Sequence, residues 1–315
     1  MPVGVAWRPL DSLLVRASWG ESFRAPNMGE MFSTQALSFE KAYDSLWCDA
    51  QGNTDGVYCN PNGSQQHRTW FGGNPDLKPE DGESLTLGAV WNITDDWSAE
   101  VSYYKVKLDN KIGSISVARL LSEEQDLGAG NHPAIVRDDS GKIETIYSFD
   151  QNIAGLTTSG YDVKTAYKLA TNYGDFTFKG ELTYVKDYKS QSAPDAAAID
   201  YAGLQDYPDL RGNLGVSWSQ NAWGAAWTTY YIGDQASGND VWGTDYLADI
   251  PGYVKHNVQL SYSHDYNGSI TLGLNNAFDK KSPTWYDGFV GYRDVYTGLY
   301  DVLGRTLFLR IEQKF

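Results

Sequence analysis

Three features of the sequence predict an all-β fold, namely an antiparallel β-barrel that crosses a membrane. Apolar and polar residues alternate in many short segments, aromatic residues are abundant, and short connections alternate with long ones. The 315 residues include 22 Tyr, 11 Trp and 11 Phe, which suits the aromatic girdles of a barrel. No window holds 18 consecutive apolar residues, so no transmembrane helix is expected. Composition alone leaves a soluble β-sandwich or carbohydrate-binding β domain open as the alternative.

Alternation with a period of two places apolar side chains on one face of each segment and polar side chains or glycine on the other. The polar faces carry charges such as Glu100, Lys179 and Glu181. Periodicity by itself does not distinguish a barrel with a wet lumen from a sandwich with charges on its surface. The predicted strands cover residues 2–7, 13–20, 84–91, 97–103, 161–169, 176–184, 214–218, 223–231, 254–262, 270–274 and 306–315.

The final segment shows the pattern most clearly, because it runs as an amphipathic strand to the last residue, an aromatic. A closed barrel, whose last strand pairs with its first, gives a reason for such an ending. The two faces are Leu307, Leu309, Ile311 and Phe315 on one side and Thr306, Arg310, Glu312 and Lys314 on the other.

The connections between the strands favour the membrane barrel. Short connections rich in Pro, Asn, Asp or Gly alternate strictly with long ones, as expected for tight periplasmic turns and large extracellular loops. Residues 118–127 could form a short helix in the second long loop. The short connections are 8–12, 93–96, 171–174, 219–222 and 264–268, and the long ones are 23–82, 110–155, 188–208, 235–252 and 279–303.

The number of strands bears on how much of a barrel the chain contains. About eleven strands are predicted, whereas single-chain bacterial barrels have an even number with both ends in the periplasm. The first residues also lack the basic and apolar regions of a secretory signal. We therefore expect residues 1–315 to form one partial barrel domain, the C-terminal half of a barrel with about twice as many strands.

Four segments, in order along the whole chain, resemble the motifs of TonB-dependent receptors. They are Phe-Arg-Ala-Pro at 23–26, Asn-Pro-Asp-Leu-Lys-Pro-Glu at 74–80, Asn-Asn-Ala-Phe-Asp-Lys at 275–280, and Gly-Arg before the final aromatic strand. Position 277 is Ala where the family often carries Leu. The residues that match the motifs are Phe23, Arg24, Ala25, Pro26, Leu77, Lys78, Pro79, Glu80, Asn276, Phe278, Asp279, Gly304, Arg305 and Phe315.

The resemblance implies a 22-stranded barrel in the bacterial outer membrane, without the plug domain, the Ton box and the signal peptide in this chain. It implies active uptake of a scarce nutrient, such as a ferric siderophore or a neutral oligosaccharide, and no enzymatic activity. The implied partners are outer-membrane lipid and lipopolysaccharide, the TonB complex through the missing N-terminal region, the barrel assembly machinery through the C-terminal strand, and the nutrient itself. A passive porin-like or adhesin-like barrel without TonB coupling is the alternative.

Cys48 and Cys59 are the only cysteines, and both lie in the first long loop. On the cell-surface side of an outer membrane they would oxidise to a disulfide, worth roughly 3 kcal/mol in the loop-entropy model. In a reducing compartment they would instead suggest a metal or redox pair.

The long loops carry the candidate ligand-binding residues. Acidic residues outnumber basic ones in the 23–82 loop, and the 235–252 loop has three Asp and no Lys or Arg. This sign disfavours polyanions such as ferric catecholates, while aromatic faces beside Asp suit neutral sugars and cationic or hydroxamate ligands. The same rings could instead form the upper girdle or pack the loops together. The candidates are Trp47, Trp70, Phe71, Trp242, Asp245, Tyr246, Trp285, Tyr286, Asp287 and Tyr292.

No pattern in the sequence predicts catalysis, a metal or a cofactor. The four histidines are scattered without the spacing of a zinc site, and no nucleophile elbow or phosphate loop is present. The net charge of −15 argues against a nucleic-acid partner, which requires a basic face.

Overall fold

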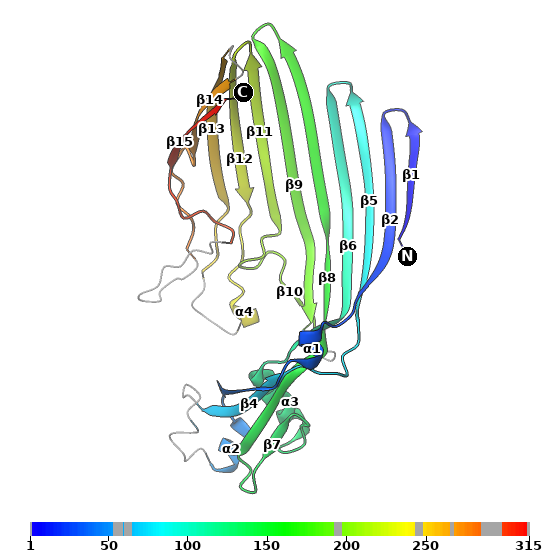
Figure 1. Ribbon diagram of the computed structural model, residues 1–315, viewed down its shortest axis with the longest axis vertical. Coiled ribbons are helices and arrows are strands. Elements are labelled where there is room, and N and C mark those ends of the chain that lie inside the picture. The colour runs from blue at the N-terminus through cyan, green and yellow to red at the C-terminus, as the bar shows by residue number, and fades with distance from the viewer. Residues whose placement is uncertain are drawn as a thin grey trace.

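The computed structural model describes residues 2–52, 59, 65–191, 197–242, 248–264, 268–284 and 298–313. In these ranges one curved antiparallel wall of eleven strands dominates the fold, in the order β1-β2-β5-β6-β8-β9-β11-β12-β13-β14-β15 (Figure 1). The strands of the wall are β1 (Val3–Leu10), β2 (Leu13–Arg24), β5 (Glu80–Thr94), β6 (Trp97–Ser114), β8 (Ile143–Thr171), β9 (Gly174–Gln191), β11 (Leu210–Gln220), β12 (Trp223–Ile232), β13 (Tyr253–His264), β14 (Gly268–Asn275) and β15 (Thr306–Gln313).

The wall confirms the predicted strands and their antiparallel order. Short turns join the strands at one end, and the long connections emerge at the other (Figure 1). In the described part of the chain β1 and β15 end the path and do not pair with each other, so the wall is an open section of a barrel. No helix among the described residues is long and apolar enough to span a membrane.

Cross-strand register places apolar side chains on one face of the wall, which we call the outer face. Val15, Ala89, Val101, Val163 and Leu182 are successive partners on five neighbouring strands. Three of them remain 46%, 41% and 40% exposed, at Val101, Val163 and Leu182 respectively. A soluble protein seldom exposes so large an apolar surface, whereas a transmembrane barrel presents this face to lipid.

The opposite, inner face of the wall is polar. Glu100, Lys164, Glu181, Asn213 and Tyr230 are successive partners across β6, β8, β9, β11 and β12. A row of charges and amides on one side and a row of aliphatic side chains on the other is the arrangement of a barrel wall around a wet lumen. The expected assignment of faces is therefore confirmed.

The first two long connections contain more regular structure than the one short helix predicted at residues 118–127. They build a small sheet in which β3 pairs with β4, β4 runs parallel to the first residues of β8, and β7 pairs with β8. This is why β8 begins at residue 143, inside the connection predicted for 110–155. The added elements are α1 (Met28–Phe32), β3 (Ala36–Lys41), α2 (Ser45–Ala50), β4 (Gln66–Gly72), α3 (Val117–Leu127) and β7 (Ile135–Arg137).

We call these six elements and residues 143–152 the loop domain; it lies at the bottom of Figure 1. Its core is apolar, and α3, close to the predicted helix 118–127, lays its apolar side against this core. Smaller elements elsewhere are β10 (Ile199–Asp200) and α4 (Asn239–Trp242). The buried core residues of the loop domain are Ile115, Val117, Leu120, Leu121, Ile135, Ile143 and Ile146.

We expect an arginine on the outer face to destabilise the barrel far more than one on the inner face. Leu214 is on the outer face and its neighbour Asn213 on the inner face. In the intact receptor, Leu214→Arg should lower the free energy of unfolding by about 2–4 kcal/mol, because a charge near the bilayer centre loses its hydration. Guanidinium unfolding in lipid vesicles measures this, with Asn213→Arg as the matched control. Equal losses in the two variants would contradict the assignment of faces.

Candidate ligand-binding site

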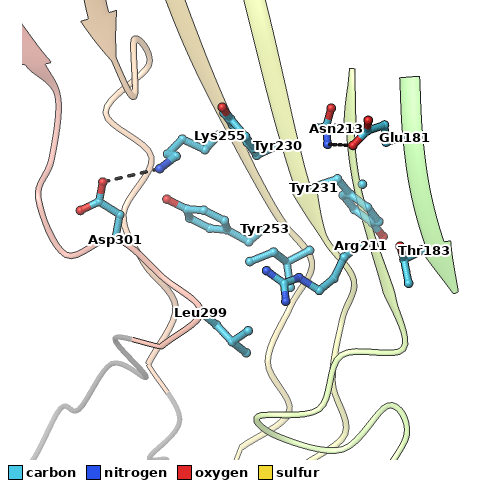
Figure 2. Close-up of a pocket in the computed structure, with 12 residues that line it drawn as sticks. Glu181, Thr183, Arg211, Asn213, Tyr230, Tyr231, Tyr253, Lys255, Leu299 and Asp301 are labelled. Atoms are coloured by element: carbon cyan, nitrogen blue, oxygen red, sulfur yellow. Dashed lines mark hydrogen bonds and ion pairs between the residues drawn. The ribbon is translucent and has the colours of Figure 1, made fainter. Parts of the chain in front are cut away.

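A pocket of about 300 Å³ opens on the inner face near the loop end of the wall. Strands β9, β11, β12 and β13 and the segment before β15 contribute its side chains, which converge in Figure 2. We call it the luminal pocket. Its polar side chains come from Glu181, Thr183, Arg211, Asn213, Tyr230, Tyr231, Tyr253, Lys255 and Asp301.

The charges of the luminal pocket are only partly neutralised by one another. Lys255 Nζ lies 3.5 Å from Asp301 Oδ2 and 5.6 Å from the centre of the Tyr230 ring. Asn213 Nδ2 donates to Glu181 Oε2 over 3.4 Å. Arg211 is exposed and forms no hydrogen bond or ion pair with any residue that the structure describes. Its guanidinium therefore has donors available for an acidic or carbonyl oxygen of a ligand.

A second pocket, of about 340 Å³, adjoins the first and shares Thr183, Arg211 and Leu299 with it. Tyr188 and Tyr207 stack in its wall with ring centres 5.2 Å apart. Asp206, which has a left-handed backbone with φ of 72°, also lines it. Because the carboxyl group is partly buried, the pKa of Asp206 is raised. Arg211 thus lies between the luminal pocket, which contains the Lys255–Asp301 ion pair, and this second pocket, which is lined by tyrosines.

A buried polar cluster holds the loops beside these two pockets in place. Gln235 Nε2 donates to the Tyr300 hydroxyl over 2.6 Å, and Gln235 Oε1 accepts from the Asp206 backbone N–H over 2.9 Å. The Tyr300 ring packs edge-on against Tyr253, with centres 5.3 Å apart. Residues 206, 235 and 300 belong to three connections that are distant in sequence, so this cluster fixes the mouth of the pocket.

The first two family motifs meet at the rim of the wall. The Arg24 guanidinium donates two hydrogen bonds to the Glu80 carboxylate, each 2.7 Å long, and a third of 3.0 Å to Glu30. Glu80 Oε1 also accepts the Ile112 backbone N–H, 2.8 Å away, at a bulge of β6. Such a fork between guanidinium and carboxylate is geometrically specific. These motif residues therefore join the loop domain to β2, β5 and β6.

The neighbouring motif residues are structural as well. Asn27 caps α1, since its side chain accepts the Glu30 N–H while the Glu30 carboxylate accepts the Asn27 N–H. Leu77 is buried, and the Lys78 backbone exchanges hydrogen bonds with the Asn152 side chain. The exposed Phe23 ends the apolar row of β2. Ala25 and Pro26 form the connection to α1, and Pro79 directly precedes β5.

The last two motifs meet in the same manner at the loop end of β14 and β15. Asn276, 1% exposed with φ of 51°, binds the Lys280 backbone through both atoms of its amide. Asp279 Oδ1 accepts the Arg305 backbone N–H over 2.9 Å. A Cβ atom at Gly304 would lie 2.6 Å from that carboxylate oxygen, so a larger residue there would displace the Asp279 side chain. Phe278 lies on the lipid side, 5.1 Å from the His256 ring.

A buried charge cluster holds the loop domain together. The side chain of Arg137 is 5% exposed and uses all five guanidinium donors, two to Asp44, two to Glu124 and one to the Gly141 carbonyl, over 2.7–2.9 Å. Burial lowers the pKa of Arg137, but the hydrogen bonds to Glu124 and Asp44 outweigh this effect and hold the pKa above its ordinary value.

Cys48 and Cys59 form the predicted disulfide, with Cα atoms 5.3 Å apart.

The structure places the described candidates of the sequence in the loop domain, away from the luminal pocket. Trp47 lies in α2, where the Lys142 ammonium is 5.7 Å from its ring. Trp70 and Phe71 are adjacent on β4 and point to opposite faces of the small sheet. Arg68 lies over the Trp70 ring at 5.7 Å. Outside the described residues, or without a described side chain, are Trp242, Asp245, Tyr246, Trp285, Tyr286, Asp287, Tyr292 and the motif residue Phe315.

The luminal pocket itself was not predicted, although part of its signal is present in the alternation. Glu181 is one of the inward charges of its strand, and Arg211 and Asn213 have the same parity on β11. Alternation indicates that these side chains point inward. It does not indicate that β9, β11, β12 and the segment before β15 bring them to one place.

Comparison with known proteins identifies the family. The sequence profile described as TonB dependent receptor-like, beta-barrel, matches residues 3–277. The chain therefore belongs to this family, and it is a protein of the outer membrane. The scan of curated protein sequences gave no match to the chain.

Solved structures share the fold over the whole chain. A mutant of the ferric enterobactin receptor PfeA from Pseudomonas aeruginosa has a TM-score of 0.67 and 17% identity, covering 100% of this chain and 40% of that one. The siderophore receptor PirA from Acinetobacter baumannii has a TM-score of 0.64 and 14% identity, covering 100% of this chain and 40% of that one. The copper transporter OprC has a TM-score of 0.57 and 19% identity, covering 100% of this chain and 39% of that one. The chain thus spans about 40% of the receptors' length, and at these identities the likeness shows the fold alone.

We predict that Arg137→Ala unfolds the loop domain locally. The variant leaves Asp44 and Glu124 buried without their cation, which costs about 3–5 kcal/mol. Hydrogen exchange of the β4 and β7 amides in the intact receptor measures the loss. Arg119→Ala is the matched control, because it removes a helix-surface pair with Glu123, 2.7 Å long, worth about 0.3–0.5 kcal/mol. Unchanged protection in Arg137→Ala would refute the role of the cluster.

We also predict that acid weakens the loop domain through His67. This side chain is buried, and burial lowers its pKa, although a bond of 3.1 Å to the Ala42 carbonyl partly offsets the effect. Below about pH 6.5 the unfolded segment therefore binds a proton that the folded one does not, and stability falls by at most about 1.4 kcal/mol per pH unit.

The measurement is exchange protection of the β4 amides at pH 7.5 and 5.5, values chosen to bracket the ordinary histidine pKa of about 6.5, corrected for the intrinsic rate. His67→Gln keeps a donor for the Ala42 carbonyl but does not titrate, so the part of the loss due to His67 should disappear. An identical loss in His67→Gln would assign the effect to other groups.

Proposed function

We propose that the chain is part of a TonB-dependent transporter that takes up an iron–siderophore complex of low net negative charge. Family membership supports the transport class. The observation that carries the proposal is the luminal pocket, in which Arg211 is a cation without a described partner beside Glu181 and the Lys255–Asp301 pair. A single available cation, Arg211, beside the carboxylates of Glu181 and Asp301 suits a ligand with few acidic groups. The acidic 23–82 and 235–252 loops disfavour polyanions.

The organisation of the intact protein is part of this proposal. We place residues 1–315 in the C-terminal half of a 22-stranded barrel whose remaining strands, plug domain and Ton box lie in the rest of the receptor. TonB would act through that region, and the barrel assembly machinery would engage β15. The ligand would pass the lumen without any bond being broken. Support for this arrangement is the open eleven-stranded wall and its coverage of 40% of the PfeA chain.

Structural neighbours support a siderophore as cargo, since PfeA is a ferric enterobactin receptor and PirA a siderophore receptor. A neutral oligosaccharide is the second candidate, because the stacked Tyr188 and Tyr207 beside the carboxyl of Asp206 offer an aromatic face with a hydrogen-bond acceptor. A strain that lacks the receptor separates the two. It should fail to grow with one siderophore as the iron source and grow normally on glycans.

We expect Arg211→Ala in the intact receptor to raise the half-saturating siderophore concentration about tenfold or more, because a charge-assisted hydrogen bond is lost. Uptake of radioactive iron measures this. Arg310→Ala is the matched control, an inner-face arginine on β15 outside the pocket. Uptake should also stop in cells without TonB. Persistence of uptake there would favour a passive barrel, and an unchanged half-saturation in Arg211→Ala would remove the pocket from the binding site.

A further inference from the structure

We propose that the open face of the small sheet in the loop domain is a docking surface for an extracellular loop from the rest of the receptor. This inference rests on the proposed function, in which further strands close the barrel, and adds a contact between the two parts. We call this surface the aromatic face. Its residues are Leu37 and Phe39 on β3, Arg68 and Trp70 on β4, and Tyr147 and Phe149 on β8.

Cross-strand register divides the small sheet into two faces. Thr69 and Ile146 are partners and both 0% exposed, so their face packs against the core of the loop domain. Leu37, Trp70 and Tyr147 are the neighbouring partners across β3, β4 and β8. Successive residues of a strand point to opposite sides. This second row therefore lies on the face that turns away from the core.

The face turned away from the core is apolar. A sheet that packs on one face usually carries polar residues on the other, where it meets water. Here Leu37 is 43% and Phe39 56% exposed, and the rings of Tyr147 and Phe149 lie beside them in the sheet with centres 5.7 Å apart. A contiguous apolar surface of this kind marks a place that another segment covers.

The position of the aromatic face identifies the segment that covers it. The loop domain lies beyond the loop end of the wall (Figure 1), where the lipid that covers the outer face of the wall does not reach. The wall is open at β1 and β15, and the chain spans 40% of the length of PfeA. In the proposed receptor the strands that close the barrel carry their own long connections at this same end. One of these connections is therefore the occupant.

The charges of the sheet define the chemistry of the occupant. Arg68 lies over the Trp70 ring at 5.7 Å, and it forms no hydrogen bond or ion pair with any residue that the structure describes. Lys41 pairs with Gln66 on the same side of the sheet and is also exposed. Both charged residues on this side are basic. The fitting segment has apolar side chains and a carboxylate that accepts from the Arg68 guanidinium.

Cysteine labelling of the intact receptor on whole cells tests whether the aromatic face is covered. Phe39 and the control position Leu127, at the end of α3, are 56% and 54% exposed. An open face would give equal rates of reaction with an impermeant maleimide for Phe39→Cys and Leu127→Cys, with the wild type as background. We expect Phe39→Cys to react at least about tenfold more slowly, without added siderophore, because the covering loop must first open.

Equal rates for the two cysteines would overturn the proposal. Protection that disappears in dilute, detergent-solubilised monomers would also overturn it, because a second copy would then be the occupant. Arg68→Glu should raise the labelling rate of Phe39→Cys about tenfold, because two like charges then meet, whereas Arg68→Lys should leave the rate low. An unchanged rate in Arg68→Glu would contradict the carboxylate opposite Arg68.

Photochemical cross-linking identifies the occupant directly. With p-benzoylphenylalanine in place of Phe39, we expect a product with the mass of one receptor, cross-linked to a peptide from outside residues 1–315. A cross-link to lipopolysaccharide, to a second copy or to a peptide of residues 1–315 would refute the proposal, as would the absence of any cross-link. None of these measurements needs transport, so a loss of siderophore uptake, which contradicts the proposed function, is a separate result.

Discussion

The wall depends on one constraint, that every backbone N–H and C=O inside a bilayer needs a partner from a neighbouring strand. Unbroken antiparallel pairing meets it, for example through ten consecutive partners between β11 and β12. The same pairing fixes which residues meet lipid, because a slip of one residue would exchange the two faces. The bulges near Leu108 and Ser159 both lie toward the loop end of their strands, where other groups can pair the backbone.

The residues of the family motifs stabilise the loop end of this wall. Arg24 and Glu80 close the rim between β2 and β5, and Asp279 with Gly304 closes it between β14 and β15. None of the motif residues lines the luminal pocket in the part of the chain that the structure describes. Motif recognition therefore identified the fold through residues that maintain it, while the residues that line the luminal pocket belong to no motif.

Alternation and loop length predicted the wall and its polar and apolar faces, because both follow from the geometry of a strand. The disulfide followed from two cysteines in an extracellular loop. The loop domain was not predictable in this way, since its sheet depends on the parallel contact of β4 with β8, between residues such as Thr69 and Ile146 that are far apart in sequence. The luminal pocket was not predicted for the same reason, because only the order of the strands in the wall brings its charged residues together.

The length of β8 has a mechanical consequence. Its 29 residues run without a break from the sheet of the loop domain to a short turn at the opposite end of the wall (Figure 1). On one edge β8 pairs with β6 across this junction, whereas its other edge pairs with β4 only up to Phe149 and with β9 only from Gly155. The β6–β8 pair is therefore the strand pairing that continues from the wall into the loop domain, and a force on the loop domain reaches the wall along these two strands.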